Sequence, residues 1–131
     1  MDKVGANTMN KTRFPRVFFE NYLYVLELSN GKYYIGITRN PMRRFKEHKN
    51  GKSNSFVKNN LPILGIKYKK LVLMDWYDAL DQESLKTIEL IEKYGIENVS
   101  GGTIIGELST RIEKFNSTKK RLGKNNFNHF D

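Results

Sequence analysis

Asn30 and Gly31 separate two runs of strand-forming residues, and this short spacing constrains the fold more than any other feature of the sequence. The runs, 22–28 and 32–38, are rich in aromatic and β-branched side chains. Both central residues of a type I′ turn need positive φ, which Asn and Gly adopt at little cost. The sequence therefore predicts an antiparallel β-hairpin.

A helix signal follows the hairpin directly. Asn40 is a typical N-cap and Pro41 a typical first helical residue, so a helix is expected from here to the Asn-Gly pair at 50–51. Met42 and Phe45, three residues apart, are expected to face the core. A short helical turn is expected within 53–59.

The second half of the chain alternates strand and helix patterns. An apolar run within 68–76 predicts a third strand, and Asp78 and Gly95 predict the two ends of a helix over 79–94. Gly101 and Gly102 indicate a tight turn. The spacing of apolar residues predicts an amphipathic helix over 106–122, with Leu108, Ile112 and Phe115 on its packed face.

These elements predict an α/β fold: a small, three-stranded, mainly antiparallel sheet with flanking helices, plus a C-terminal helix. At 131 residues the chain has the length of one domain. We expect a flexible N-terminal arm over 1–13, the α/β domain over 14–103, and a basic C-terminal helix and tail over 104–131.

The charge balance favours a polyanionic partner. Twenty-three Lys and Arg residues stand against fourteen Asp and Glu, a formal net charge of +9. Such a charge suits nucleic acid first and an acidic membrane surface second. The absence of Cys excludes disulfides, thiol nucleophiles and Cys-based zinc sites. No apolar run reaches about 20 residues and no secretory signal is evident, so an intracellular protein, cytoplasmic or nuclear and not secreted, is expected.

Glu83 is an unusual residue in its predicted helix. It lies three residues after Leu80 and four before Thr87, which places a carboxylate on the core-facing stripe. Burying a charge is costly unless a cation is near. The alternative interpretation is a glutamate at the edge of the stripe, whose stem packs while its head reaches water.

Several residues occur together in the order and spacing of a known family. Tyr22-Leu23-Tyr24, followed ten residues later by Tyr34-Ile35-Gly36, resembles the signature of the GIY-YIG nucleases. The positions that match further family motifs are Arg44, His48, Glu83 and Asn98. The resemblance spans about 22–102.

This resemblance implies a catalytic site and a cofactor. The implied catalytic residues are Tyr24, Tyr34, Arg44, His48 and Glu83, with Glu83 as the ligand of one Mg²⁺ (or Mn²⁺). Arg44 is suited to a bidentate contact with phosphate. A phenol of pKa about 10 is a poor base, and a neighbouring cation would lower its pKa. Which Tyr or His acts as the base stays open.

The implied substrate is DNA, with RNA not excluded. The residues expected to contact it are Arg43, Lys46, Asn98, Arg111 and Lys114. A single site cuts one strand, so a homodimer or a partner protein stays open as the source of specificity. A non-catalytic nucleic-acid-binding module on the same scaffold is the main alternative. A basic membrane-surface protein ranks last, because no helix has a sufficient apolar face.

The family resemblance requires both tyrosines to point into one cleft, and this requirement tests the hairpin register. A two-residue turn would place Tyr24 opposite Ile37 and the two phenols on opposite faces of the hairpin. Pairing of Tyr24 with Gly36 would place them on one face. The sequence and the resemblance together therefore predict a three-residue loop or a bulge.

Overall fold

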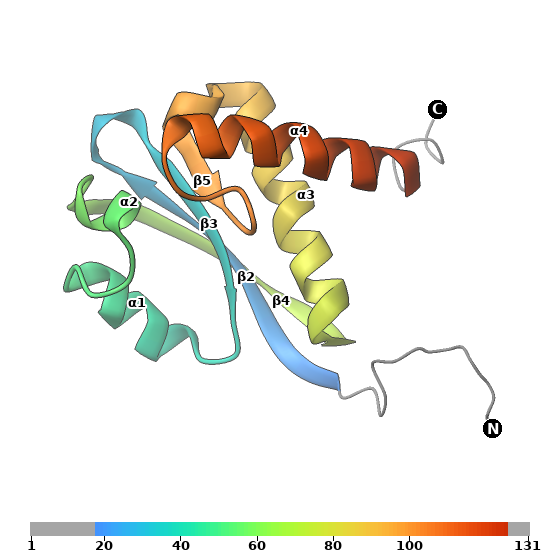
Figure 1. The fold of residues 1–131 in the computed structure, drawn as a ribbon. Coiled ribbons are helices and arrows are strands. Elements are labelled where there is room, and N and C mark those ends of the chain that lie inside the picture. The colour runs from blue at the N-terminus through green and yellow to red at the C-terminus, as the bar shows by residue number, and fades with distance from the viewer. Residues whose placement is uncertain (1–17, 126–131) are drawn as a thin grey trace.

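The computed structural model describes residues 18–125, which form a four-stranded sheet flanked by helices (Figure 1). The predicted N-terminal arm lies outside the described residues, as does 126–131. In chain order the elements are β2 (Phe18–Leu28), η2 (Ser29–Gly31), β3 (Tyr33–Thr38), α1 (Pro41–Lys49), α2 (Ser55–Lys58), β4 (Ile63–Asp75), α3 (Trp76–Tyr94), η3 (Ile96–Asn98), β5 (Val99–Gly101) and α4 (Leu108–Asn125).

The sheet has the strand order β4-β2-β3-β5, with antiparallel pairing throughout except between β3 and β5. The predicted α/β class is confirmed, and β5 adds a fourth strand where only a turn was expected. Gly101 permits this pairing, because a Cβ there would lie 2.5 Å from the carbonyl oxygen of Ile35 and 2.9 Å from Thr87 Oγ1. The predicted turn follows β5, with a bridge between Gly101 and Ile104.

The hairpin has the predicted three-residue loop. Leu28 N–H donates to the carbonyl of Lys32 across η2, and Asn30 and Gly31 have φ values of 63° and 69°. Tyr24 pairs with Gly36. The register prediction is therefore confirmed.

Two apolar clusters lie on the two faces of the sheet. One cluster, which includes Tyr24 and Tyr34, packs against α1 and α2. The other, which includes Leu23 and Ile35, packs against α3 and Leu122 of α4. Figure 1 shows the same division, with α1 and α2 on one side of the sheet and α3 and α4 on the other.

The first helix ends where predicted, but its packed face differs. The Asn40 side chain accepts from Arg43 N–H, as expected of an N-cap. Phe45 is half-buried against Tyr24, whereas Met42 is 81% exposed, so the prediction that Met42 faces the core is wrong. The inward positions include His48 instead, because the polar site is built on this face.

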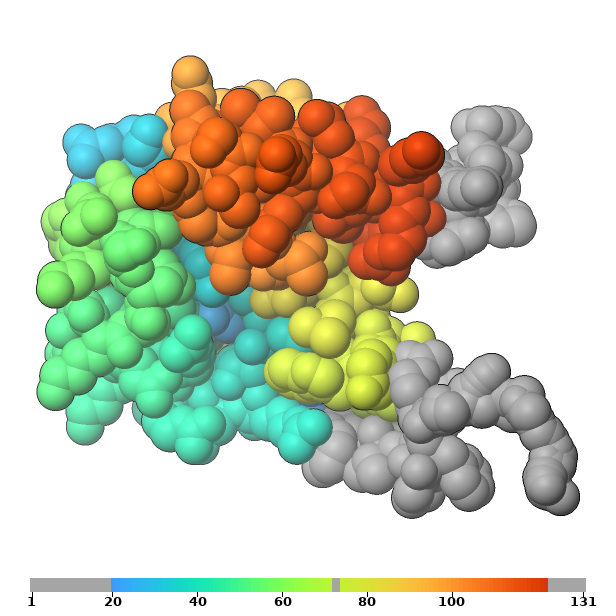
Figure 2. All heavy atoms as spheres, viewed as in Figure 1, coloured from blue at the N-terminus to red at the C-terminus, as the bar shows by residue number. Residues whose placement is uncertain are grey.

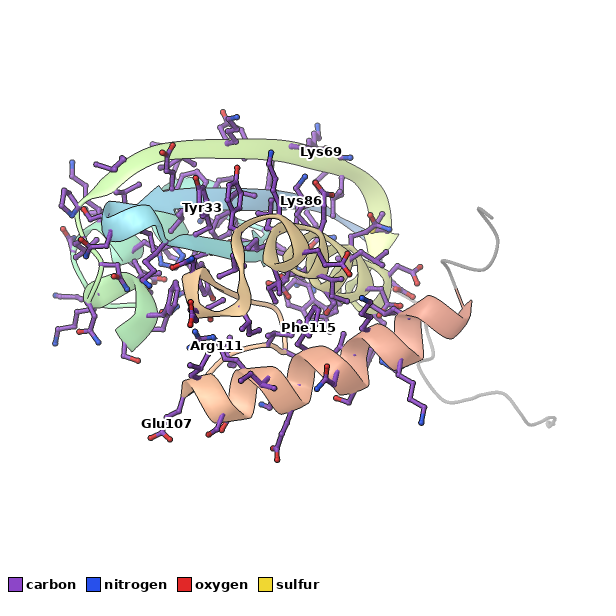
Figure 3. The ribbon with its side chains drawn as sticks, turned by 90° about the horizontal axis from the view of Figure 1, so that it is seen from above. Tyr33, Lys69, Lys86, Glu107, Arg111 and Phe115 are labelled. Atoms are coloured by element: carbon purple, nitrogen blue, oxygen red, sulfur yellow. The ribbon has the colours of Figure 1, made fainter. Side chains whose placement is uncertain are left out.

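The other helices correct two further expectations. The N-cap of α3 is Asp75, whose Oδ1 accepts from Asp78 N–H, so this helix begins three residues before the predicted start. In α4, Leu108 and Ile112 are 40% and 42% exposed, and the packed side chains are Arg111, Phe115, Thr118 and Leu122. Figure 3 shows Arg111 and Phe115 pointing from α4 toward the rest of the domain.

None of the helices in the described part of the chain combines the length and apolar character that a membrane-spanning segment needs.

Candidate active site

Tyr24 and Tyr34 lie on the sheet face that α1 and α2 cover. Their ring centroids are 6.5 Å apart, and the two residues are 1% and 8% exposed. Gly36 provides the space for Tyr24, because a Cβ at that position would lie 2.4 Å from the phenol oxygen and 2.5 Å from Cζ. The glycine of the second motif is therefore needed to let the Tyr24 ring lie across β3.

His48 is fully buried on α1 and contacts Tyr24. Its Nε2 lies 2.6 Å from the Tyr24 hydroxyl oxygen, and its Nδ1 lies 2.6 Å from Ser53 Oγ. Burial, and to a smaller extent the Arg44 guanidinium, lowers the pKa of His48 to about 4, so the ring is neutral at pH 7. The phenol is the more acidic hydroxyl, so we assign its O–H as donor to Nε2 and the ring N–H to Ser53.

Arg44 connects the tyrosines with the edge of the site. It hydrogen-bonds both phenol oxygens, and its Nη1 donates to Glu47 Oε1 at 2.9 Å. One third of the Arg44 side chain is exposed. Arg44 therefore has both a fixed position and access to a ligand.

Glu83 is buried on α3, at 8% exposure, near the end of β3. The backbone N–H of Ile37 donates to its carboxylate, and Gly102, with φ of 56°, lies against its side chain. Burial raises the pKa of Glu83 to about 7, against the opposing effects of the Ile37 hydrogen bond and Arg44. The alternative of a stripe-edge glutamate with its head in water is therefore wrong.

The tyrosines do not have lowered pKa values in the protein alone. Burial raises the pKa of Tyr24 and of Tyr34, and the charge of Glu83 adds to this shift. Hydrogen bonds and charge from Arg44 oppose the shift without reversing it. Arg44 thus acts in the expected direction, but desolvation outweighs it, and the expected effect of a bound Mg²⁺ on these pKa values stays a prediction.

The residues predicted to contact nucleic acid fall into two groups. Arg43 and Lys46 of α1 and Lys114 of α4 are exposed. Asn98 instead donates to Tyr94 O at 2.9 Å and accepts from Lys32 Nζ at 2.9 Å. Arg111 is 7% exposed, and its guanidinium donates to the carbonyl oxygens of Gly106, Ile96 and Glu97 at 2.9, 3.1 and 3.3 Å. The polar groups of these two residues are therefore engaged within the domain.

Three residues of this site had no separate sequence signal. Ser53 accepts from His48, Asn54 hydrogen-bonds Tyr34, and Glu47 holds Arg44. Asn54 also caps α2 by accepting from Val57 N–H. An Asn before a short helical turn indicates an N-cap, but it gives no sign of the contact between Asn54 and Tyr34.

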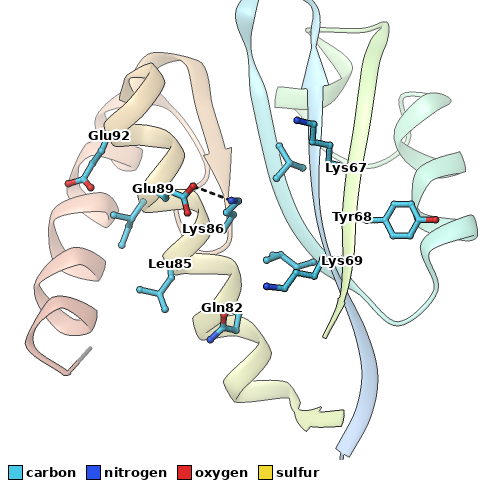
Figure 4. A pocket seen from close by; sticks show the side chains of 11 residues that line it. Lys67, Tyr68, Lys69, Gln82, Leu85, Lys86, Glu89 and Glu92 are labelled. Atoms are coloured by element: carbon cyan, nitrogen blue, oxygen red, sulfur yellow. Dashed lines mark hydrogen bonds and ion pairs between the residues drawn. The ribbon is translucent and has the colours of Figure 1, made fainter. Parts of the chain in front are cut away.

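Two of the hollows near the sheet bear on the candidate site. One, of about 440 Å³, adjoins the site and includes Arg44 and Ile37 in its lining. In Figure 2 the surface is recessed between the α1–α2 segment and the α3–α4 segments. The other, of about 660 Å³, lies between β4 and α3, with lysines 67, 69 and 86 at its rim and Leu23 among its lining residues (Figure 4). Because Leu23 and Tyr24 are adjacent in β2, this second hollow opens on the face away from the tyrosines.

Buried tyrosines, an arginine and a buried carboxylate thus meet near the end of β3 in this small α/β sheet. The profile of the GIY-YIG catalytic domain matches residues 20–100, and the chain belongs to the GIY-YIG family. No solved structure is significantly similar to this chain.

Curated relatives match a shorter segment. UPF0213 protein spr1390 of Streptococcus pneumoniae is 43% identical over 42 residues, which cover 32% of this chain and 42% of that protein. UPF0213 protein Reut_B5558 of Cupriavidus pinatubonensis is 40% identical over 42 residues, which cover 32% of this chain and 47% of that protein. The chain thus spans less than half the length of the curated relatives it matches.

Proposed function

We propose that the chain is a metal-dependent endonuclease that hydrolyses phosphodiester bonds of DNA at a single site. The observation that carries this proposal is the convergence of one buried carboxylate, Glu83, with Arg44 and the hydrogen-bonded Tyr24–His48 pair. Membership of the GIY-YIG family supports it.

Glu83 suits a divalent cation of the Mg²⁺ or Mn²⁺ type. A carboxylate that burial destabilises gains strongly from a nearby cation, which would bring its pKa back down. Within residues 18–125 no group of three or more His, Cys, Asp or Glu side chains could hold a metal ion. One carboxylate fits Mg²⁺, which keeps several of its waters when bound. Such an ion would supply Lewis-acid polarisation of a phosphate oxygen.

Tyr24 is the favoured acceptor for the proton of the attacking water. Its O–H donates to His48, so its oxygen can accept a proton while its own proton passes to Nε2. This relay avoids a free phenolate, whose formation the raised pKa of Tyr24 disfavours. Burial and Arg44 disfavour the imidazolium formed on His48, and the negative charge of the phosphate would offset part of this cost. Tyr34 is the alternative base.

Arg44 would bind the phosphate and relieve its developing charge. Its guanidinium has five N–H donors, and Glu47 accepts a hydrogen bond from the one at Nη1. A bidentate guanidinium is better suited than an ammonium group to two oxygens of one phosphate.

The competing function is a binding module that uses the same scaffold without catalysis. The charge of +9 suits both functions equally. Glu83 favours the enzyme, since a buried carboxylate beside a phosphate site repels the ligand unless a cation lies between them.

The test is incubation with plasmid, branched, single-stranded and RNA substrates, in Mg²⁺ and in EDTA. Cleavage of at least one DNA substrate in Mg²⁺ and none in EDTA is expected. Binding without cleavage of any substrate in Mg²⁺ or Mn²⁺ would favour the binding module instead. Comparison of nicked with linear plasmid products shows whether a second copy or a partner is needed to cut both strands.

A further inference from the structure

The hollow beside the candidate active site contains residues that have no role in the proposed hydrolysis. It is lined by Ile37 and Thr38 at the end of β3 and by Arg39, Arg43 and Trp76. Arg44 and Glu47 complete the lining and join the hollow to the active site. Three arginines against one glutamate give it a net positive charge.

Trp76 is the aromatic residue that lines this hollow. It is the first residue of α3, held there by the Asp75 cap, and it is partly exposed. The Arg39 guanidinium carbon lies 5.3 Å from the centroid of a Trp76 ring, a cation–π contact. Aromatic rings and arginine planes are the two surfaces on which proteins stack unpaired nucleobases.

We propose that this hollow binds the nucleotide next to the scissile phosphate, with its base stacked on the Trp76–Arg39 pair and its phosphate near Arg43. The proposal rests on the proposed nuclease function and adds the substrate class. A base can reach a tryptophan only when it is not stacked in a duplex. The preferred substrate is therefore DNA with unpaired bases at the cleavage site, such as a single strand, a flap or a branch.

The dimensions and the connection to the site agree with this occupant. A volume of about 440 Å³ is in the range of pockets that hold small ligands. Two residues that line the hollow also contact the active site. The backbone N–H of Ile37 donates to Glu83, and Arg44 contacts both tyrosines. A nucleotide in the hollow would thus lie directly beside the phosphate that Arg44 binds.

The chain contains one tryptophan and seven tyrosines, so fluorescence excited at a wavelength that tyrosine does not absorb reports on Trp76 alone. The experiment titrates the full chain, in EDTA, with a single-stranded oligonucleotide, the matching duplex and an abasic single strand of equal length. We expect strong quenching by the single strand and little by the duplex or the abasic strand. Equal quenching by the abasic strand would overturn base stacking, and equal quenching by the duplex would overturn the preference for unpaired bases.

Variants test the same contact by the anisotropy of a labelled oligonucleotide. Trp76→Ala is expected to weaken binding of the single strand on the order of tenfold and to leave binding of the abasic strand within about twofold. Trp76→Phe keeps a ring and should recover most of the loss. The matched control is Tyr77→Ala, because Tyr77 is 51% exposed and does not line the hollow.

Unchanged binding of the single strand by Trp76→Ala would overturn the proposal. Because these measurements need no metal and no cleavage, their outcome is separate from that of the nuclease test. If the protein cleaves DNA but shows no base-dependent quenching, the base-stacking proposal is overturned and the proposed nuclease function stands.

Discussion

The carboxyl group of Glu83 links function to stability at the scale of a single residue. Its pKa in the folded protein is about 7, above the ordinary value of 4.5. Between these values the folded state holds a proton that the unfolded state releases, so the free energy of unfolding falls as pH rises from about 4.5 to 7. Above pH 7 the full destabilisation is present.

Glu83→Gln should therefore stabilise the protein at pH 8. The expected gain in the free energy of unfolding is about 1–3 kcal/mol at pH 8 and close to zero at pH 4.5, in the absence of divalent ions. Urea denaturation at the two pH values measures it, with the exposed Glu113→Gln as control. A loss of stability at pH 8 would contradict the described burial of this carboxyl.

Gly36 offers a second test at the residue scale. In Gly36→Ala the new methyl group would overlap the Tyr24 ring, which must then move away from His48. We expect a loss of about 1–3 kcal/mol in stability and at least about a 100-fold loss of cleavage rate. The control is Gly65→Ala, where the nearest atom, Glu27 Oε1, is 3.3 Å from the new Cβ. Cleavage by Gly36→Ala at the wild-type rate would mean that Tyr24 needs no fixed position.

At the scale of elements, Arg111 holds the start of α4 against η3. It donates to three backbone carbonyl oxygens and lies 5.3 Å from the centroid of the Phe56 ring. Arg111→Ala should therefore cost about 2–4 kcal/mol of stability, since these carbonyls lose their donors. The slope of log affinity against log salt should stay unchanged.

Lys114→Ala is the matched comparison on the same helix. Lys114 is exposed, so its loss should leave stability within about 0.5 kcal/mol. If Lys114 contacts phosphate, the salt slope should become shallower by about 0.9. Thermal melts measure the change in stability, and binding at several salt concentrations measures the salt slope. Together they distinguish the structural role of Arg111 from the phosphate contact expected of Lys114. The opposite pattern, with Arg111→Ala changing only the salt slope, would mean that Arg111 faces DNA.

The elements that could be predicted are those with local signals. The hairpin follows from Asn30-Gly31, α1 from Asn40-Pro41, and the end of α3 from Gly95. The three residues of β5 form a strand only by pairing with β3, which is more than sixty residues earlier in the chain. The packed face of α4 was missed because Arg111, a charged residue, occupies it.

The candidate site was predictable to a similar degree. The family resemblance identified the five residues that lie together around β3: Tyr24, Tyr34, Arg44, His48 and Glu83. Ser53 and Glu47 were not found, because serine and glutamate next to a helix have no distinctive spacing. The raised pKa values of the tyrosines were also missed, because desolvation depends on how α1 and α2 cover the sheet.

At the scale of the whole molecule, the proposed function separates two properties: affinity for DNA, which depends on net charge, and cleavage, which depends on Glu83. Under the proposed function, the net charge of +9 would attract DNA largely independently of Glu83. Glu83 itself is buried beside the proposed phosphate site, where its negative charge opposes binding in the absence of a metal ion. A variant at this position therefore changes catalysis and affinity in different directions.

The most direct test measures cleavage and binding of the same DNA substrate by Glu83→Gln. Single-turnover cleavage in Mg²⁺ should fall by at least about 100-fold, because the proposed metal ligand is lost. The dissociation constant measured in EDTA should be equal to that of the wild type or slightly lower, because a negative charge has been removed. Cleavage by Glu83→Gln at a rate close to the wild type would contradict the assignment of this site.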